Sequence, residues 1–181
     1  MTHTRLAGPA LSRRNLLKVG LFGSAVLATA GGLASLSGCS ASNPASGFSV
    51  LRAEDLPFLR AFIPAALAGS VPAEQRAQQI EITLHSIDHS LSYAPAESLK
   101  PLLQLFDLLS MPVSRGPSTG IWGSWASADS ASVEAFIRRW ENSSISLLNM
   151  GAATLQQLVQ TAWYSKPESW AGCHYPGPPT V

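Results

Sequence analysis

The stretch SLLNMGAATLQQLVQTAW, residues 146–163, decides the fold class of this chain. Its apolar residues recur at intervals of three and four, which places them along one side of an α-helix and predicts that this side faces a core. Gly151 falls inside the stretch, where it predicts either a close contact with another helix or a kink. The residues assigned to the inward side are Leu147, Leu148, Leu155, Leu158, Val159 and Ala162.

The same spacing recurs earlier in the chain and predicts four more helices. The first begins at its N-cap, Asp55, and the others cover residues 72–93, 95–110 and 130–141. Pro101 falls in the first two turns of the third helix, where it predicts a bend. No stretch shows the sustained alternation of a β-strand. The sequence therefore predicts an all-α fold, a small single-domain bundle of roughly five or six helices with an extended Pro/Gly-rich C-terminal tail.

Residues 111–129 interrupt the helical pattern. This stretch holds two prolines and three glycines, which predict that no regular helix forms in it. Trp122 and Trp125 supply apolar bulk there. Either these two side chains fold back onto the domain or they form part of a contact surface, since long loops in compact domains are often functional and tryptophan is common at interfaces.

The N-terminal region has the pattern of an export signal. An arginine pair is followed by an uncharged run from Val19 to Leu36, whose glycines make it a poor membrane span. The motif resembles twin-arginine (Tat) signals, whose consensus is Ser-Arg-Arg-x-Phe-Leu-Lys, with a leucine in place of the phenylalanine. We therefore expect the Tat translocase to export the chain to the periplasm. The motif consists of Ser12, Arg13, Arg14, Leu16, Leu17 and Lys18.

A second motif lies at the end of this N-terminal export signal, which we call the leader. The sequence LSGC at residues 36–39 resembles a bacterial lipobox, in which the cysteine is acylated and becomes the new N-terminus. Cys39 is thus a candidate lipidation site that would anchor the chain to a membrane without spanning it, and ordinary cleavage near Ala41 or Ala45 is the alternative. The predicted parts are a signal peptide with this candidate lipobox at 1–39, a linker at 40–52, and a helical domain with its C-terminal tail at 53–181.

Removal of the leader changes the charge of the chain. Four of the 12 basic residues precede Cys39 and all 11 acidic residues follow it, so 8 basic residues remain against 11 acidic ones. A net charge of about −3 without a basic stripe argues against a nucleic-acid partner, because phosphate binding needs clustered Lys and Arg. Cys173 is then left without a second cysteine, which indicates a buried thiol or an intermolecular disulfide in an oxidising compartment.

Few residues are candidates for chemistry. His85 and His89 lie four residues apart on a predicted helix with Glu81 one turn earlier, a set that could bind a metal, but two polar residues on an outer helix face are the simpler interpretation. A phosphate loop, a dinucleotide fingerprint and a nucleophile elbow are all missing from the sequence. The residues therefore favour a chain with no catalytic residue, no metal site and no cofactor of its own.

The C-terminal segment combines aromatic residues with prolines. Such a tail cannot build its own core and is expected to lie on something. The order of residues in it resembles the gluconate 2-dehydrogenase subunit 3 family, the small subunits of membrane-associated flavin dehydrogenases. His174 departs from that family, which usually has a glycine before the following tyrosine. The resemblance rests on Trp163, Tyr164, Ser165, Pro167, Trp170, Tyr175, Pro176, Gly177 and Pro178.

This resemblance implies a complex in which three subunits have separate roles. A large flavin subunit would carry FAD and oxidise a sugar, a sugar acid or an alcohol, and a cytochrome c subunit would carry haem c. The small subunit would bind the large one and take it through the Tat translocase, with Cys173 as a candidate for an intersubunit disulfide. The alternative is a free-standing periplasmic lipoprotein that binds a small ligand between its helices or another partner. The candidate partner contacts are Trp122, Trp125, Trp163, Tyr164, Trp170, Tyr175, Pro176, Gly177 and Pro178.

Overall fold

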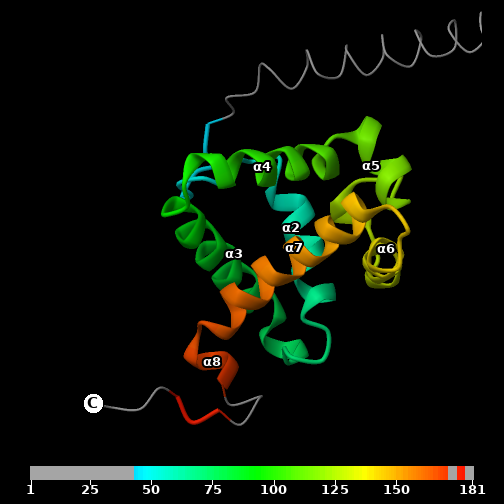
Figure 1. Cartoon of the computed structure of the whole chain (residues 1–181). Helices are drawn as coiled ribbons and strands as arrows, with labels where there is room; N and C mark the ends of the chain where they lie inside the picture. The colour runs from blue at the N-terminus through cyan, green and yellow to red at the C-terminus, as the bar shows by residue number, and fades with distance from the viewer. Residues whose placement is uncertain (1–42, 171–174, 178–181) are drawn as a thin grey trace, which may run out of the picture. The chain divides into compact units, whose positions relative to one another are not determined.

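The computed structural model describes residues 43–170 and 175–177, and this part of the chain is all-α (Figure 1). Seven α-helices occur in it, so the predicted fold class is confirmed, and the two α-helices not predicted are α5 and the short α8. The helices are α2 (Leu56–Ala66), α3 (Arg76–Ser92), α4 (Ala96–Ser110), α5 (Pro112–Thr119), α6 (Ser130–Glu141), α7 (Ser146–Tyr164) and α8 (Pro167–Trp170), with single 3-10 turns η1 (Ala73–Gln75) and η2 (Trp125–Ser127).

Helix α2 is the central element of the described domain. It contacts α3, α4, α6, α7 and η2, and Figure 1 shows it between α3 and α6. Arg60 is its single charged residue, and the apolar side chains around it are buried. The rings of Phe58 and Phe62 join a run of aromatic contacts that continues through Trp125, Phe136 and Trp140. Burial of such large rings is the main stabilising contribution to a core of this size.

The segment before α2 is folded onto the domain, so the predicted linker is wrong from Pro44 onward. The Asp88 carboxylate on α3 accepts hydrogen bonds from the backbone N–H groups of Ser49, Val50 and Leu51, each at 2.8 Å. The side chain of Leu51 is fully buried in the core. Composition alone suggested a linker because it does not reveal that a carboxylate 37 residues later would bind three consecutive amides.

Arg52 connects the segment before α2 to the start of α2 and to α4. Its guanidinium donates to Asp55 at 2.9 and 2.8 Å and forms an ion pair with Asp107 on α4 at 2.7 Å. These hydrogen bonds and charges raise the pKa of Arg52 above its usual value, despite burial. Asp55 does occupy the predicted N-cap position of α2, but its carboxylate binds Arg52 and does not cap the helix.

Helix α5 corrects the prediction that residues 111–129 contain no regular helix. Pro112 stands at the first helical position, where its missing N–H is not needed. Gly120 ends the helix in the left-handed conformation with φ 79°, and its N–H donates to the carbonyl of Gly116. A proline at the start and a glycine at the end are thus boundary residues of this short helix, although composition made them look like helix breakers.

Replacing Asp88 tests the role of its carboxylate. We expect Asp88→Ala to lower the free energy of unfolding by about 2–4 kcal/mol, because three backbone N–H groups lose their acceptor while Leu51 remains in the core. Urea unfolding followed by circular dichroism measures this difference. The matched control is Glu97→Ala, the removal of an exposed carboxylate on α4, with an expected change below about 1 kcal/mol. Equal changes for the two variants would contradict this role of Asp88.

Candidate partner-binding surface

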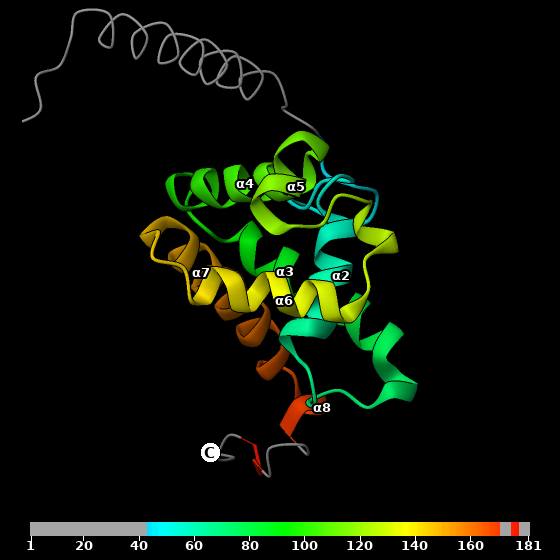
Figure 2. The same cartoon turned by 90° about the vertical axis from the view of Figure 1, so that its right-hand side faces the viewer.

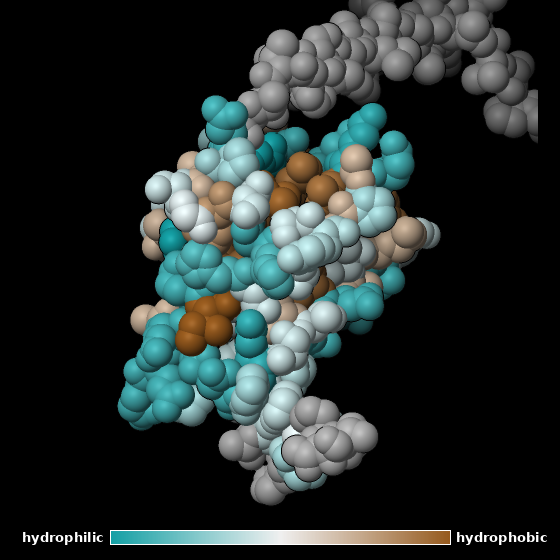
Figure 3. Space-filling model, turned by 90° about the vertical axis from the view of Figure 1, so that its left-hand side faces the viewer, coloured by the Kyte–Doolittle hydropathy of each residue, from teal (hydrophilic) through white to brown (hydrophobic). Residues whose placement is uncertain are grey.

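An apolar groove lies between α4 and α7. Both helices lie on one side of α2, at the front of Figure 1 and toward the left of Figure 2. The groove has a volume of about 450 Å³. Figure 3 shows the side of the molecule at the left of Figure 1. On that side, some apolar residues are also exposed among hydrophilic ones. The apolar side chains that line the groove are Pro101, Leu102, Leu105, Leu108, Leu147, Leu148 and Met150.

The floor of the groove is formed by a tryptophan packed against a glycine. Trp140 on α6 is almost fully buried, and its indole N–H donates to the carbonyl of Ser118 at 2.8 Å. A Cβ added to Gly151 on α7 would lie 2.8 Å from Cζ3 of this ring. The prediction that Gly151 marks a close helix contact is therefore confirmed, because no larger residue leaves room for the indole.

Two residues at the rim of the groove are far more exposed than the sequence suggested. Leu147 is 75% exposed and Met150 is 64% exposed, although Leu147 is predicted to face the core. The prediction for Leu147 is wrong because this residue lines the groove between α4 and α7 and stays open to solvent. A sequence signal for this surface exists, since none of the 19 residues of α7 is charged.

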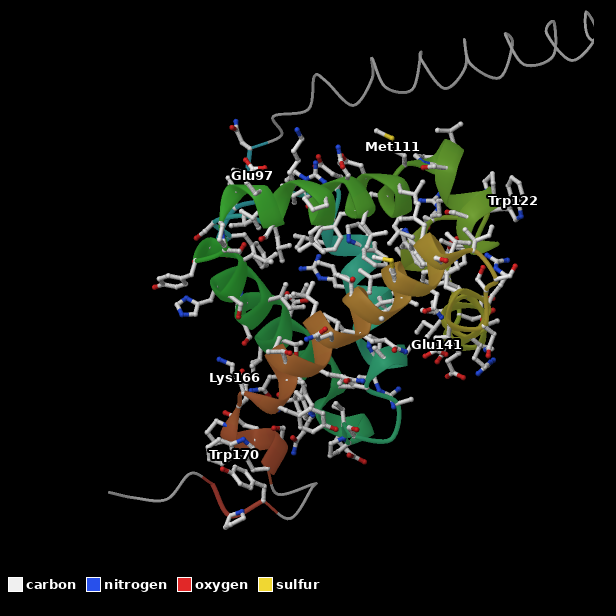
Figure 4. The ribbon with its side chains drawn as sticks, in the orientation of Figure 1. Glu97, Met111, Trp122, Glu141, Lys166 and Trp170 are labelled. Carbon is white, nitrogen blue, oxygen red and sulfur yellow. The ribbon has the colours of Figure 1, made fainter. Side chains whose placement is uncertain are left out.

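The tryptophans named as partner contacts fall into two groups. Trp125 and Trp163 are each only 3% exposed, so both are wrong as contacts of the folded domain. Trp125 completes the core by packing on Phe58, and its indole N–H donates to the carbonyl of Leu109 at 2.7 Å. Trp122 is 78% exposed, and its ring lies against Gly116 at the outer edge of α5 (Figure 4). Folding back onto the domain is therefore confirmed for Trp125, whereas the contact role of Trp122 stays a prediction.

The described tail residues fold around Trp170. The indole N–H of Trp170 donates to the carbonyl of Tyr164 at 3.1 Å, and its own carbonyl accepts from the backbone N–H of Tyr175 at 3.0 Å. The ring of Tyr175 meets the indole edge-on, and Gly177 adopts a positive φ of 96° beside it. Tyr164, Tyr175 and Pro176 remain exposed. The described residues 175–177 thus lie against Trp170, and α8 replaces part of the predicted extended conformation.

The exposed aromatic residues do not form one patch. In Figure 4, Trp122 lies beside α5 and Trp170 lies at the far end of the described domain, below the end of α7. Helix α7 ends near Trp170, whereas Figure 2 shows its start apart from α5. A partner that touched both aromatic regions would therefore have to span the described domain.

The histidines of α3 make other contacts. Glu81 accepts two hydrogen bonds from Arg60, at 2.7 and 3.0 Å, and this pairing lowers the pKa of Glu81. The ring of His85 stacks on Phe48 at 4.6 Å, and His89 meets Tyr93 edge-on. Within the described ranges, no group of three His, Cys, Asp or Glu residues could hold a metal ion.

Several predicted functional residues are not covered by the structure. They lie outside the described residues, and their roles stay predictions. They are the leader residues Ser12, Arg13, Arg14, Leu16, Leu17 and Lys18, the cysteines Cys39 and Cys173, and Pro178.

The chain was compared with known proteins. No protein-family model, curated protein or solved structure matches it. Among the helices of the described part, none has both the length and the hydropathy that a membrane span requires. The candidate surface is therefore defined by its own geometry: an apolar groove, an uncharged helix and an aromatic side chain exposed beside α5.

Two glycine substitutions test the packing under the groove. We expect Gly151→Ala to lower the free energy of unfolding by about 1–3 kcal/mol, because the new methyl group meets the buried ring of Trp140. Gly116→Ala is the matched control, since its methyl group would meet Trp122 at 2.5 Å, but that exposed ring can turn away. Thermal unfolding of both variants measures the difference, and a cost at Gly116 equal to that at Gly151 would contradict this account.

Proposed function

We propose that this chain is a non-catalytic accessory subunit that binds a folded FAD-dependent dehydrogenase and escorts it through the Tat translocase. The observation that carries the proposal is the apolar surface of α4 and α7, where Leu147 and Met150 are exposed next to a leucine-lined groove. Contiguous exposed apolar surface on a domain with a complete core is typical of a binding site. The Tat-like leader agrees with this role, because that pathway carries folded proteins and one signal can serve two chains.

The partner supplies the chemistry in this proposal. The large subunit would hold FAD and oxidise a sugar, sugar acid or alcohol, and a cytochrome c subunit would hold haem c and accept the electrons. These assignments rest on the resemblance of the C-terminal segment to the gluconate 2-dehydrogenase subunit 3 family. The exposed residues of that segment, Tyr164, Tyr175 and Pro176, together with Trp122, are the candidate contacts that remain accessible.

A second function has one observation in its favour. The groove volume of about 450 Å³ falls in the range of small-molecule pockets, which fits a free-standing periplasmic lipoprotein that binds a small ligand. A ligand-binding protein is expected to enclose its ligand, whereas the rim residues Leu147 and Met150 are open to solvent. A stable complex with a flavoprotein is the observation that separates the two functions.

Co-purification tests the proposed function directly. The full chain carries an affinity tag and is produced in the cells that encode it, and membrane and periplasmic fractions are purified separately. We expect a flavoprotein to elute with the chain in a fixed ratio, detected by flavin absorbance and mass spectrometry. Elution of the chain alone from both fractions would exclude the escort function and leave the free-standing lipoprotein.

Substitution of the leader arginines tests the escort step. We expect Arg13→Lys with Arg14→Lys to leave the flavin dehydrogenase activity in the cytoplasm, because the partner would depend on this leader for export. The chain offers a matched control in its other arginine pair, Arg138→Lys with Arg139→Lys on α6, which preserves charge in the folded domain. Activity is assayed in both compartments, and periplasmic dehydrogenase activity in the leader variant would contradict the proposal.

A further inference from the structure

The outer side of α5 is apolar. Val113 is 68% exposed, and Pro117 follows it four residues later on the same side of the helix. The ring of Trp122, which is 78% exposed, lies against Gly116, the neighbour of both on the helix surface. These side chains therefore form one continuous surface with the exposed Pro112. We call this surface the α5 edge: Pro112, Val113, Pro117 and Trp122.

The charge around the α5 edge is positive. Between Asp107 and Asp129 the only charged residue is Arg115. Arg115 is 9% exposed, its Nε has no hydrogen-bond partner, and it belongs to none of the ion pairs within the described ranges. A guanidinium is well suited to bind phosphate, because its planar set of donors matches the oxygen atoms of that group. The α5 edge thus combines exposed apolar side chains with a cation that pairs with no carboxylate of the described domain.

The chain enters the described domain at the end that carries the α5 edge. Figures 1 and 2 are related by a 90° turn about the vertical axis, and both place α4, α5 and the start of the segment before α2 at the top. Arg52 of this segment pairs with Asp107 on α4 at 2.7 Å, so the segment is fixed at this end. In Figure 4, Met111 between α4 and α5 lies at the same end, whereas Trp170 lies at the opposite one.

The connection to the candidate lipidation site is short. The folded segment begins at Pro44, which is bridged to Arg52, and Cys39 precedes Pro44 by five positions. An extended chain spans at most about 3.6 Å per residue, so an acylated Cys39 would keep Pro44 within about 18 Å of the leaflet. A single acyl chain gives only reversible membrane binding, and a second contact beside it makes the attachment stable. The α5 edge is in the right place to supply that contact.

From these observations we propose that the α5 edge docks on the lipid leaflet to which the N-terminus of the chain is attached. Trp122 then lies at the interface, and headgroup phosphates balance the charge of Arg115. Both residue types are typical of this interface, since each has an apolar body and a polar end. The attachment rests on the predicted lipobox and not on the proposed flavin partner. Trp122 is thereby assigned to the membrane, while the region of Trp170 lies away from it and is left for a partner protein.

Photo-crosslinking in isolated membranes tests this inference. A photoreactive residue replaces Val113 in the full chain, which is produced in the cells that encode it, and mass spectrometry identifies the product. We expect a lipid adduct at position 113. The control position is Glu168, exposed on α8 at the opposite end of the described domain, where the yield of lipid adduct should be roughly tenfold lower.

A charge substitution provides the second arm. Trp122→Asp should reduce the yield of lipid adduct at position 113 roughly fivefold, because a carboxylate replaces an apolar contact and is repelled by anionic headgroups. The matched control is Tyr164→Asp, which replaces another exposed aromatic side chain at the end of α7 and should leave the yield unchanged. Circular dichroism of both purified variants verifies that the fold is kept.

Each outcome supports or overturns the docking of the α5 edge. A lipid adduct at position 113 that is scarce at position 168 supports it, whereas equal yields at the two positions overturn it. A crosslink from position 113 to a protein, no crosslink at all, or an unchanged yield in Trp122→Asp also overturns it. A flavoprotein that co-purifies with a chain giving no lipid adduct would support the proposed function alone, so the two proposals can fail separately.

Discussion

The Asp88 carboxylate is the interaction on which the described domain depends. It lies on α3 and holds three consecutive backbone amides of the segment before α2. This fixes Leu51 in the core and Arg52 between Asp55 and Asp107, so one segment connects α3, α2 and α4. Buried charges are tolerated here because each has hydrogen-bond partners. Most buried apolar side chains come from the helices, and this segment links three of those helices.

Much of the helical architecture follows from the sequence alone. The apolar spacing predicts α2, α3, α4, α6 and α7 with boundaries within a few residues, because each buries one continuous side. Periodicity cannot reveal α5, since a helix of eight residues is too short to show a repeat and its proline and glycine resemble loop residues. Composition likewise cannot reveal that residues 44–52 are folded, because their hydrogen bonds come from a side chain far away in sequence.

The candidate surface is harder to predict from the sequence than the fold. A helical stripe of leucines looks the same whether it faces a core or a partner, so the pattern predicts Leu147 inward although the fold leaves it exposed. The tryptophans show the opposite error, since Trp125 and Trp163 resemble interface residues yet complete the core. Which side of a helix is covered depends on the neighbouring helices. The missing charges of α7 are a local property, and they do indicate this surface.

The uncharged character of α7 has a kinetic consequence. Fast association between proteins depends on long-range attraction between charges, to which this helix contributes nothing. Any steering of a partner toward α7 therefore comes from charged residues elsewhere on the domain, and without such steering association proceeds at about 10⁵–10⁶ M⁻¹s⁻¹. Affinity at such a surface comes from slow dissociation of the buried apolar contact. These rates suit two chains that meet once, soon after synthesis, and then remain together for their lifetime.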